Sequence, residues 1–281
     1  MGYQRSKHYG RREGISLGGA ITISGAAASP NMGYHSSPLV TIIMTLFNAR
    51  LGAWLANPGS PGKGLWPKEG PTYAVRPFVD EAFGRTTDTN AWVYLSDGGH
   101  FENLALYEMV LRRCHNIVVI DASQDPGFQY EDLGNAIRKI RIDLGVPIEF
   151  KPQKPIPTTK GGEGPHWAVG EIQYSFVEGP GTDGVLLYVK PCLNGSEPKD
   201  VLAYSKAQPD FPHQSTADQW FDEPQFESYR RLGYHSIDEL MGFSGKASTL
   251  SQLLHNACVA NGLARTLGVE DEGAGVIPGA A

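Results

Sequence analysis

An aspartate followed by two glycines is the part of this chain best suited to acid–base chemistry. Asp97 follows the apolar run Trp-Val-Tyr-Leu and precedes Gly98, Gly99 and a predicted helix. In open α/β sheets ligands bind beyond the carboxyl ends of the strands, so a carboxylate placed there faces a crevice. Such a group can accept a proton from a hydroxyl nucleophile. The alternative is an ordinary turn in which Asp97 hydrogen-bonds its own backbone.

A serine nucleophile would complete such a site, and Ser16 is one candidate. The segment from Gly14 to Gly18 fits the pattern Gly-x-Ser-x-Gly. That pattern exposes its serine only in a sharp turn between a strand and a helix. Polar residues precede Gly14, and residues 20–24 are predicted to form a strand. The context therefore does not support Ser16 on either side.

Metal and disulfide chemistry have little support. Asp121 and Asp125 follow a predicted strand, but no third ligand is spaced to join them, so we expect no metal. The cysteines, Cys114, Cys192 and Cys258, are odd in number and far apart. They match neither a zinc site nor a disulfide framework and fit a reducing compartment.

Composition narrows the function classes further. The chain has 281 residues, a net charge of −6 and 41% hydrophobic residues, which suits a packed globular protein. The acidic balance argues against a general nucleic-acid binder. No signal peptide is visible. The most apolar stretch, residues 39–55, is shorter than the roughly 20 apolar residues that span a bilayer. We expect a cytoplasmic protein.

Strands and helices alternate around Asp97. Hydrophobic periodicity predicts strands at residues 20–24, 92–95, 117–120 and 146–150, helices at 38–56, 103–113 and 131–143, and a long loop at 57–89. Alternation of this kind is typical of parallel crossovers. The predicted fold is α/β, with a mostly parallel sheet and helices on both faces.

The chain changes character after residue 154. Residues 167–174 and 184–190 are predicted to form a β-hairpin, with helices near 218–232 and 247–267. The aromatic-rich segment around residues 213–230 is predicted to pack against the sheet. We therefore predict an aspartate-bearing domain at 1–154, an appendage packed on it at 155–270 and a disordered tail at 271–281.

The turn at Asp97 resembles the Asp-Gly-Gly/Ala motif of patatin-like and cytosolic phospholipase A2-like acyl hydrolases. In that family an asparagine–leucine pair follows, and Asn103 and Leu104 match it. Residues 24–30 resemble the small-residue segment that precedes the motif in patatins and ends, as here, in Ser29-Pro30. The strand at 117–120 with the acid after it also resembles the phospholipase pattern. The likeness covers residues 17–150.

The resemblance implies hydrolysis of lipid acyl esters by a Ser-Asp dyad, with Asp97 as the catalytic acid and no cofactor. The implied substrate is a lipid or membrane surface, reached by a protein peripheral to the membrane. Gly98, Gly99, Asn103, Ser29, Pro30 and His35 would shape the site. In the family the serine elbow and oxyanion loop precede the aspartate, so we expect them upstream, in a missing N-terminal part of the same protein. The alternatives are a self-sufficient hydrolase that uses Ser16 and a non-catalytic module that binds lipid or protein.

Overall fold

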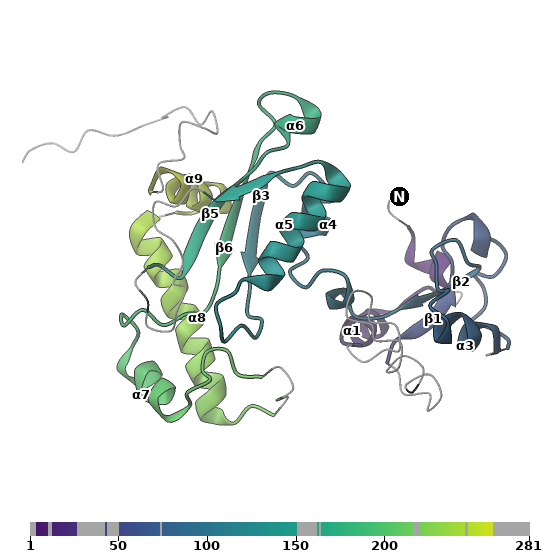
Figure 1. Ribbon diagram of the computed structural model, residues 1–281, viewed down its shortest axis with the longest axis horizontal. Helices are drawn as coiled ribbons and strands as arrows, with labels where there is room; N and C mark the ends of the chain where they lie inside the picture. Colours follow the sequence, from purple (N-terminus) through teal and green to yellow (C-terminus); the bar gives the residue numbers. More distant parts are fainter. Residues whose placement is uncertain are drawn as a thin grey trace, which may run out of the picture. The chain divides into compact units, whose positions relative to one another are not determined.

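Two compact units make up the chain, Met1–Asn103 and Leu104–Ala281. The computed structural model describes residues 4–10, 13–26, 43, 51–73, 75–150, 162, 164–215, 218, 220–244 and 247–260 (Figure 1). The division falls at residue 103, whereas the sequence predicted it after residue 154. The reason is strand pairing, because the strands on either side of residue 155 belong to one sheet. The predicted tail at 271–281 lies outside the described residues.

Unit 1 is built around a two-stranded antiparallel sheet. Its elements are η1 (Ser6–Tyr9), α1 (Leu17–Ser24), β1 (Ala53–Ala56), η3 (Ser60–Gly62), α3 (Val75–Ala82), β2 (Trp92–Leu95) and η4 (Gly98–His100). Ala53 pairs with Leu95, and Ala56 with Trp92. Residues 53–56 therefore form a strand, although the sequence predicted the end of a helix. Residues 38–42 and 44–50 of that predicted helix lie outside the described part.

The segment at residues 20–24 is helical, so the predicted strand there is wrong. Ser16 caps α1, and its Oγ accepts the N–H of Gly19 at 3.0 Å. The hydroxyl of Thr22 donates to the carbonyl of Gly18 at 2.9 Å, turning a β-branched side chain back onto the helix. An N-cap of this kind contributes about 1 kcal/mol, which offsets part of the cost of the glycines and β-branched residues in this helix.

Asn57 organises the predicted loop at 57–89. This side chain is 4% exposed. Its Nδ2 donates to the carbonyls of Asp88 and Asn90, both at 2.7 Å, and its Oδ1 accepts the N–H of Gly59 at 2.8 Å. Its carbonyl accepts the indole N–H of Trp66 at 2.9 Å. One buried amide thus joins the two ends of the segment, which also contains η3 and α3.

Unit 2 is an α/β unit with a four-stranded mixed sheet. Its elements are α4 (Leu106–Leu111), β3 (Asn116–Ile120), α5 (Glu131–Leu144), β4 (Ile148–Phe150), β5 (Trp167–Ile172), α6 (Ser175–Glu178), β6 (Gly184–Val189), α7 (Lys199–Ala207), α8 (Glu223–Ser244) and α9 (Leu250–Ala260). The strand order is β3-β6-β5-β4, with β3 and β6 parallel and the other two pairings antiparallel. The prediction of a mostly parallel sheet is therefore wrong.

The predicted hairpin of β5 and β6 is confirmed, but it lies in the centre of the sheet and is no appendage. All six residues of β6 are buried. β3, predicted as a strand buried on both faces, is an edge strand in which burial alternates. A strand in the centre of a sheet is buried on both faces and needs a continuous apolar run. β6 has such a run and lies in the centre, whereas β3 lies at the edge. β2, expected in the same sheet, pairs with β1 in unit 1.

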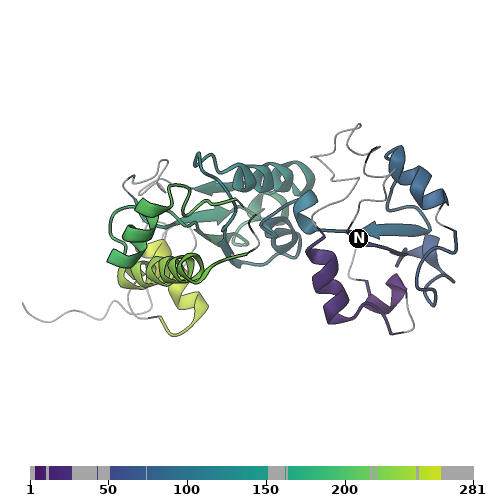
Figure 2. The same cartoon turned by 90° about the horizontal axis from the view of Figure 1, so that it is seen from below.

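Helices cover both faces of the four-stranded sheet, as Figure 2 shows for α5 and α8. On one face Leu186 and Tyr188 of β6 pack with residues of α4 and α5, among them Leu106 and Ile140. The intervening residues of β6, including Leu187, pack on the other face with α8 and α9. Because successive side chains of a strand point to opposite faces, β6 contributes residues to the hydrophobic cores on both faces of the sheet.

The aromatic-rich segment before α8 forms a third cluster. Phe211 contacts the rings of Tyr204 and Tyr229 edge-on, at centroid distances of 5.1 and 4.8 Å. The sequence predicted that this segment packs against the sheet, but Phe211 packs with Leu193 and Leu232 instead. In the described part of the chain, no helix has the length and apolar character needed to cross a bilayer.

Candidate functional site

Asp97 lies two residues beyond Leu95, the end of strand β2, and caps the short helix η4. Its Oδ1 accepts the N–H of Gly99 at 2.7 Å. This is the turn hydrogen bond that the sequence left open as the alternative to a catalytic role. The side chain is half-buried. Its second oxygen, Oδ2, accepts no hydrogen bond from any described residue. One oxygen is thus held by the backbone, and the other remains able to accept a proton.

Gly99 is the glycine that this turn requires. A Cβ there would lie 2.9 Å from Oδ1 of Asn103 and 3.2 Å from Oδ1 of Asp97. A Cβ on Gly98 would meet nothing within 4 Å. The side chains of Asp97 and Asn103 therefore close around one glycine and leave the other open. The turn thus brings Asp97 together with three of the residues predicted to shape the site, Gly98, Gly99 and Asn103.

The small-residue segment also meets the turn. The N–H of Asp97 donates to the carbonyl of Ala26 at 3.4 Å, and Ala26 is 1% exposed. Because a methyl group is the whole side chain of Ala26, the backbone can pass this close to the turn. The later residues of that segment, Ser29 and Pro30, and the predicted site residue His35 lie outside the described residues.

Ser16 does not act with Asp97 in this structure. Its side chain is exposed and caps α1, and the two side chains share no hydrogen bond. The helix that the elbow pattern needs does follow Ser16, contrary to our expectation. Among the described residues before Gly14 no strand precedes it, and residues 6–9 form a 3-10 helix. Ser16 borders a cavity of about 220 Å³ that Asp97 does not line.

A serine–histidine pair lies in the same turn, and the sequence analysis missed it. The Oγ of Ser96 is 3.0 Å from Nδ1 of His100. Both residues are half-buried. The spacing of four residues across an Asp-Gly-Gly turn was the signal that could have revealed the pair. A hydroxyl and an imidazole at this distance can exchange a proton.

A second polar cluster lies in unit 2, where the parallel strands β3 and β6 end. Asp121 is 1% exposed and accepts hydrogen bonds from the Tyr188 hydroxyl and, at 3.0 Å, from Nζ of Lys190. Lys190 also lies 3.5 Å from Asp125. Burial alone would raise the pKa of Asp121, but hydrogen bonds from Ser123 and Tyr188 and the charge of Lys190 hold it below its usual value. Both predicted acids therefore face an internal cation.

His213 closes this cluster. It is 4% exposed, and its ring nitrogens make no hydrogen bond within the described part of the chain. Burial and the neighbouring charge of Lys190 lower its pKa, so the ring is neutral near pH 7. Among the residues that the structure describes, no group of three or more His, Cys, Asp or Glu side chains is arranged to hold a metal.

His166 sits beside this cluster in a buried network of its own. Its carbonyl accepts the N–H of Lys190 at 3.0 Å. Its ring nitrogens contact Glu239 and, at 3.4 Å, Glu197. Burial lowers the pKa of His166, but hydrogen bonds with Cys192, Glu197 and Glu239 outweigh this effect and raise it to about 11. The arrangement is an internal ion pair, with His166 and Glu197 fully buried.

The three cysteines are free thiols, and Cys192 and Cys258 are buried. The turn at Asp97 is thus a place in unit 1 where a half-buried carboxylate keeps one oxygen without a partner among the described residues, while Asp121 and Asp125 of unit 2 lie against Lys190. Comparisons of the chain with protein-family models, with curated proteins and with solved structures found no match.

Proposed function

We propose that this chain carries the catalytic aspartate of a lipid acyl ester hydrolase that works by a Ser-Asp dyad. Asp97 accepts the proton of a serine hydroxyl as that oxygen attacks the ester carbonyl, and it passes this proton to the departing alcohol as the acyl-enzyme forms. Asp97 then takes a proton from water, whose oxygen attacks the acyl-enzyme, and returns the proton to the serine oxygen as the fatty acid leaves. No cofactor enters either step.

The observation that carries this proposal is the asymmetry of the Asp97 carboxylate. The Gly99 N–H fixes Oδ1 at 2.7 Å, and Oδ2 has no hydrogen-bond partner among the described residues. A base must be held in one orientation and still keep a lone pair available for the incoming proton. The contact between Asp97 and Ala26 adds support, because the resemblance places a small-residue segment beside this turn.

Ser16 is not the hydroxyl partner in this proposal. Its Oγ accepts the Gly19 N–H and shares no hydrogen bond with Asp97. The nucleophile and the oxyanion-binding N–H groups are instead assigned to a part of the protein other than the described residues. That assignment follows the family pattern, in which both precede the aspartate.

A second candidate is hydrolysis by Ser96, with His100 as its base. The distance of 3.0 Å between Ser96 Oγ and His100 Nδ1 favours it. Ser96 and Asp97 are adjacent in the sequence, so the two mechanisms use different side chains of one turn. The two mechanisms differ in which substitution removes activity.

The experiment measures ester hydrolysis by the longest natural product of the gene that contains this chain, with p-nitrophenyl butyrate and phosphatidylcholine vesicles as substrates. Asp97→Asn keeps the hydrogen bond from Gly99 and removes the base, so kcat is expected to fall about 10²–10⁴-fold. Ser96→Ala is expected to retain activity. Loss of activity in Ser96→Ala with retention in Asp97→Asn would replace the proposal with the second candidate. Absence of hydrolysis by the wild-type protein would leave the non-catalytic binding module.

A further inference from the structure

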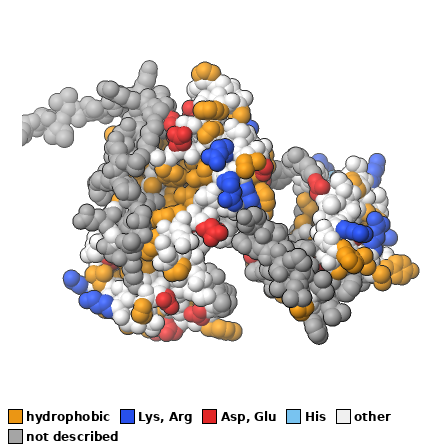
Figure 3. Space-filling model, viewed as in Figure 1, with side chains coloured by type: hydrophobic (Ala, Val, Ile, Leu, Met, Phe, Trp, Pro, Cys, Tyr) orange, Lys and Arg blue, Asp and Glu red, His pale blue; other side chains and the backbone are white. Residues whose placement is uncertain are grey.

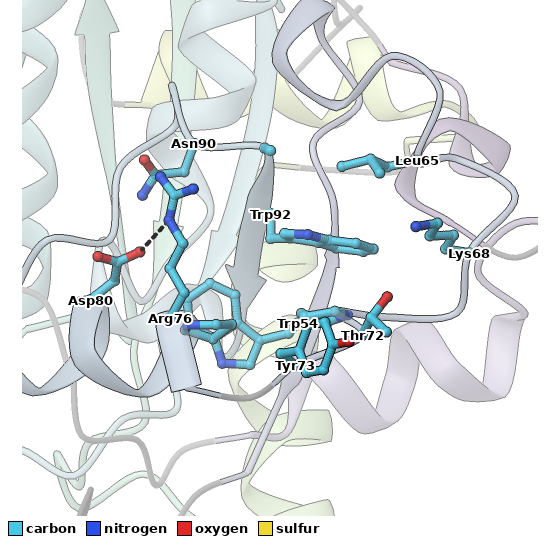
Figure 4. A pocket seen from close by; sticks show the side chains of 12 residues that line it. Trp54, Leu65, Lys68, Thr72, Tyr73, Arg76, Asp80, Asn90 and Trp92 are labelled. Atoms are coloured by element: carbon cyan, nitrogen blue, oxygen red, sulfur yellow. Dashed lines mark ion pairs between the residues drawn. The ribbon is translucent and has the colours of Figure 1, made fainter.

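A cavity of about 320 Å³ lies in unit 1, between the ends of β1 and β2, the loop after η3 and helix α3. Its walls include the rings of Trp54, Trp92 and Tyr73 and the cations Lys68 and Arg76. Figure 4 shows the Trp92 ring between Lys68, which comes from the loop, and Arg76, which comes from α3. Asp97 does not line this cavity, and the mechanism proposed above does not use it.

The charges of the cavity suit an anion. It is lined by two cations and one carboxylate, that of Asp80. Asp80 lies 3.8 Å from Nε of Arg76, a distance at which the guanidinium keeps its other N–H groups available. Lys68 is exposed and forms no ion pair with a described residue. The two cations therefore give the cavity lining a net positive charge that attracts an anionic group.

Trp54 adds an unused donor. Its indole Nε1 is buried and makes no hydrogen bond within the part of the chain that the structure describes. A buried N–H without a partner is unfavourable by about 1–3 kcal/mol. Trp54 lines the cavity, as do Trp92 and Tyr73. These aromatic walls fit an organic group attached to a phosphate.

An exposed apolar ridge lies next to the cavity. Val75, Val79 and Phe83 recur every fourth residue along α3 and its end, so they share one side of the helix. They are 74%, 38% and 71% exposed, and Tyr73 at the cavity is 81% exposed. The guanidinium of Arg85 lies 5.6 Å from the centre of the Phe83 ring. Figure 3 shows hydrophobic and basic side chains side by side over this region.

We infer that this end of unit 1 binds the headgroup of an anionic phospholipid at a membrane surface. Lys68 and Arg76 attract the anionic headgroup, the headgroup lies against Trp54 and Trp92, and the ridge enters the interface. Exposed aromatic and apolar side chains flanked by cations are the combination that anionic bilayers attract. A soluble phosphate ester could bind in the cavity near the two cations, but it would leave the apolar ridge exposed to water.

The test measures co-sedimentation of the full chain with vesicles of phosphatidylcholine, with and without phosphatidylglycerol. Binding is expected only when phosphatidylglycerol is present. Arg76→Gln and Lys68→Gln are each expected to weaken it about fivefold. Arg141→Gln, which removes an exposed arginine of α5 in unit 2, is the charge control and is expected to bind as the wild type does.

The ridge has a matched control. Phe83→Ser is expected to weaken vesicle binding, whereas Phe176→Ser is not, although both phenylalanines are 71% exposed. Equal binding of Arg76→Gln and the wild type would overturn the inference, as would equal losses in Phe83→Ser and Phe176→Ser. Binding of glycerol 3-phosphate without any preference for phosphatidylglycerol vesicles would assign the cavity to a soluble phosphate ester. The assay needs no hydrolysis, so its outcome is independent of the role of Asp97.

Discussion

The Nζ of Lys190 lies 3.0 Å from Oδ2 of Asp121, and both side chains are almost completely buried. The two residues follow neighbouring parallel strands, β3 and β6, whose carboxyl ends meet at one edge of the sheet. Asp125 and Tyr188 complete the partners of this pair. Breaking a buried ion pair from one side leaves an uncompensated charge inside the protein.

Lys190→Met is therefore expected to destabilise unit 2 by about 3–5 kcal/mol. Hydrogen exchange of the β5 and β6 amides measures this, because those strands share the core with Lys190. Arg230→Gln is the control. Its partner Glu227 is on the surface, with side-chain exposures of 52% and 50%, and exposed pairs contribute at most about 1 kcal/mol. Similar effects of the two substitutions would show that Lys190 is not an internal counterion.

The His166–Glu197 pair predicts a stability maximum in mildly acidic solution. The pKa of His166 is raised to about 11, so its contribution is complete below about pH 6.5 and is lost as the pH rises through 11. The pKa of Glu197 falls to about 2: burial raises it, but hydrogen bonds from His166, Asn194 and Gly195 outweigh that. Its contribution is complete above pH 4.5 and is lost as the pH falls toward 2.

Unfolding of wild type and His166→Gln across this range tests the prediction. The stability difference is expected to be largest between pH 4.5 and 6.5 and to shrink at higher pH by at most about 1.4 kcal/mol per unit. Glu197→Gln is expected to remove the loss on the acidic side. A difference that stays constant from pH 6 to 10 would mean that His166 is neutral in the folded protein.

Local sequence patterns predicted individual strands and helices of this chain better than they predicted which strands pair with each other. The hairpin of β5 and β6 and helix α5 follow from periodicity, because each is decided by residues close in sequence. The pairing of β3 with β6 joins residues 69 positions apart, as the bond from Lys190 to Asp121 does, and no local signal gives it. Hence Asp121 was identified as an acid at a strand end, while its counterion was missed.

The candidate site shows the same division. The turn at Asp97 is local, and its glycines and following asparagine could be recognised in the sequence. Whether Asp97 keeps an oxygen available depends on the geometry of that turn, which composition does not give. At Ser16 the β-branched residues that follow favoured a strand, but these residues form a helix whose first turn is capped by the Ser16 hydroxyl.

Gly99→Ala tests whether the orientation of Asp97 matters for activity. A Cβ there would press on Asn103 and on Asp97 itself, at 2.9 and 3.2 Å. Because the end of the Asn103 side chain can move, the fold is expected to survive while the carboxylate shifts. We expect ester hydrolysis by the gene's longest product to fall at least about tenfold, since a base must lie within hydrogen-bond reach of its proton. Gly98→Ala, in open space, is the matched control. If both variants keep full activity, the turn does not position a catalytic group.

Ser16 offers the last prediction, which separates a helix cap from a nucleophile. Aspartate caps helices about as well as serine does but cannot form an acyl-enzyme. Ser16→Asp is therefore expected to leave both α1 and ester hydrolysis intact. Ser16→Ala is expected to weaken α1 locally by about 0.5–2 kcal/mol, measured by exchange of the Gly19 amide, because its hydrogen bond to Ser16 is lost. Loss of hydrolysis in Ser16→Asp with a stable helix would instead assign the nucleophile to Ser16, and the exposed hydroxyl would then have to leave its cap to reach Asp97.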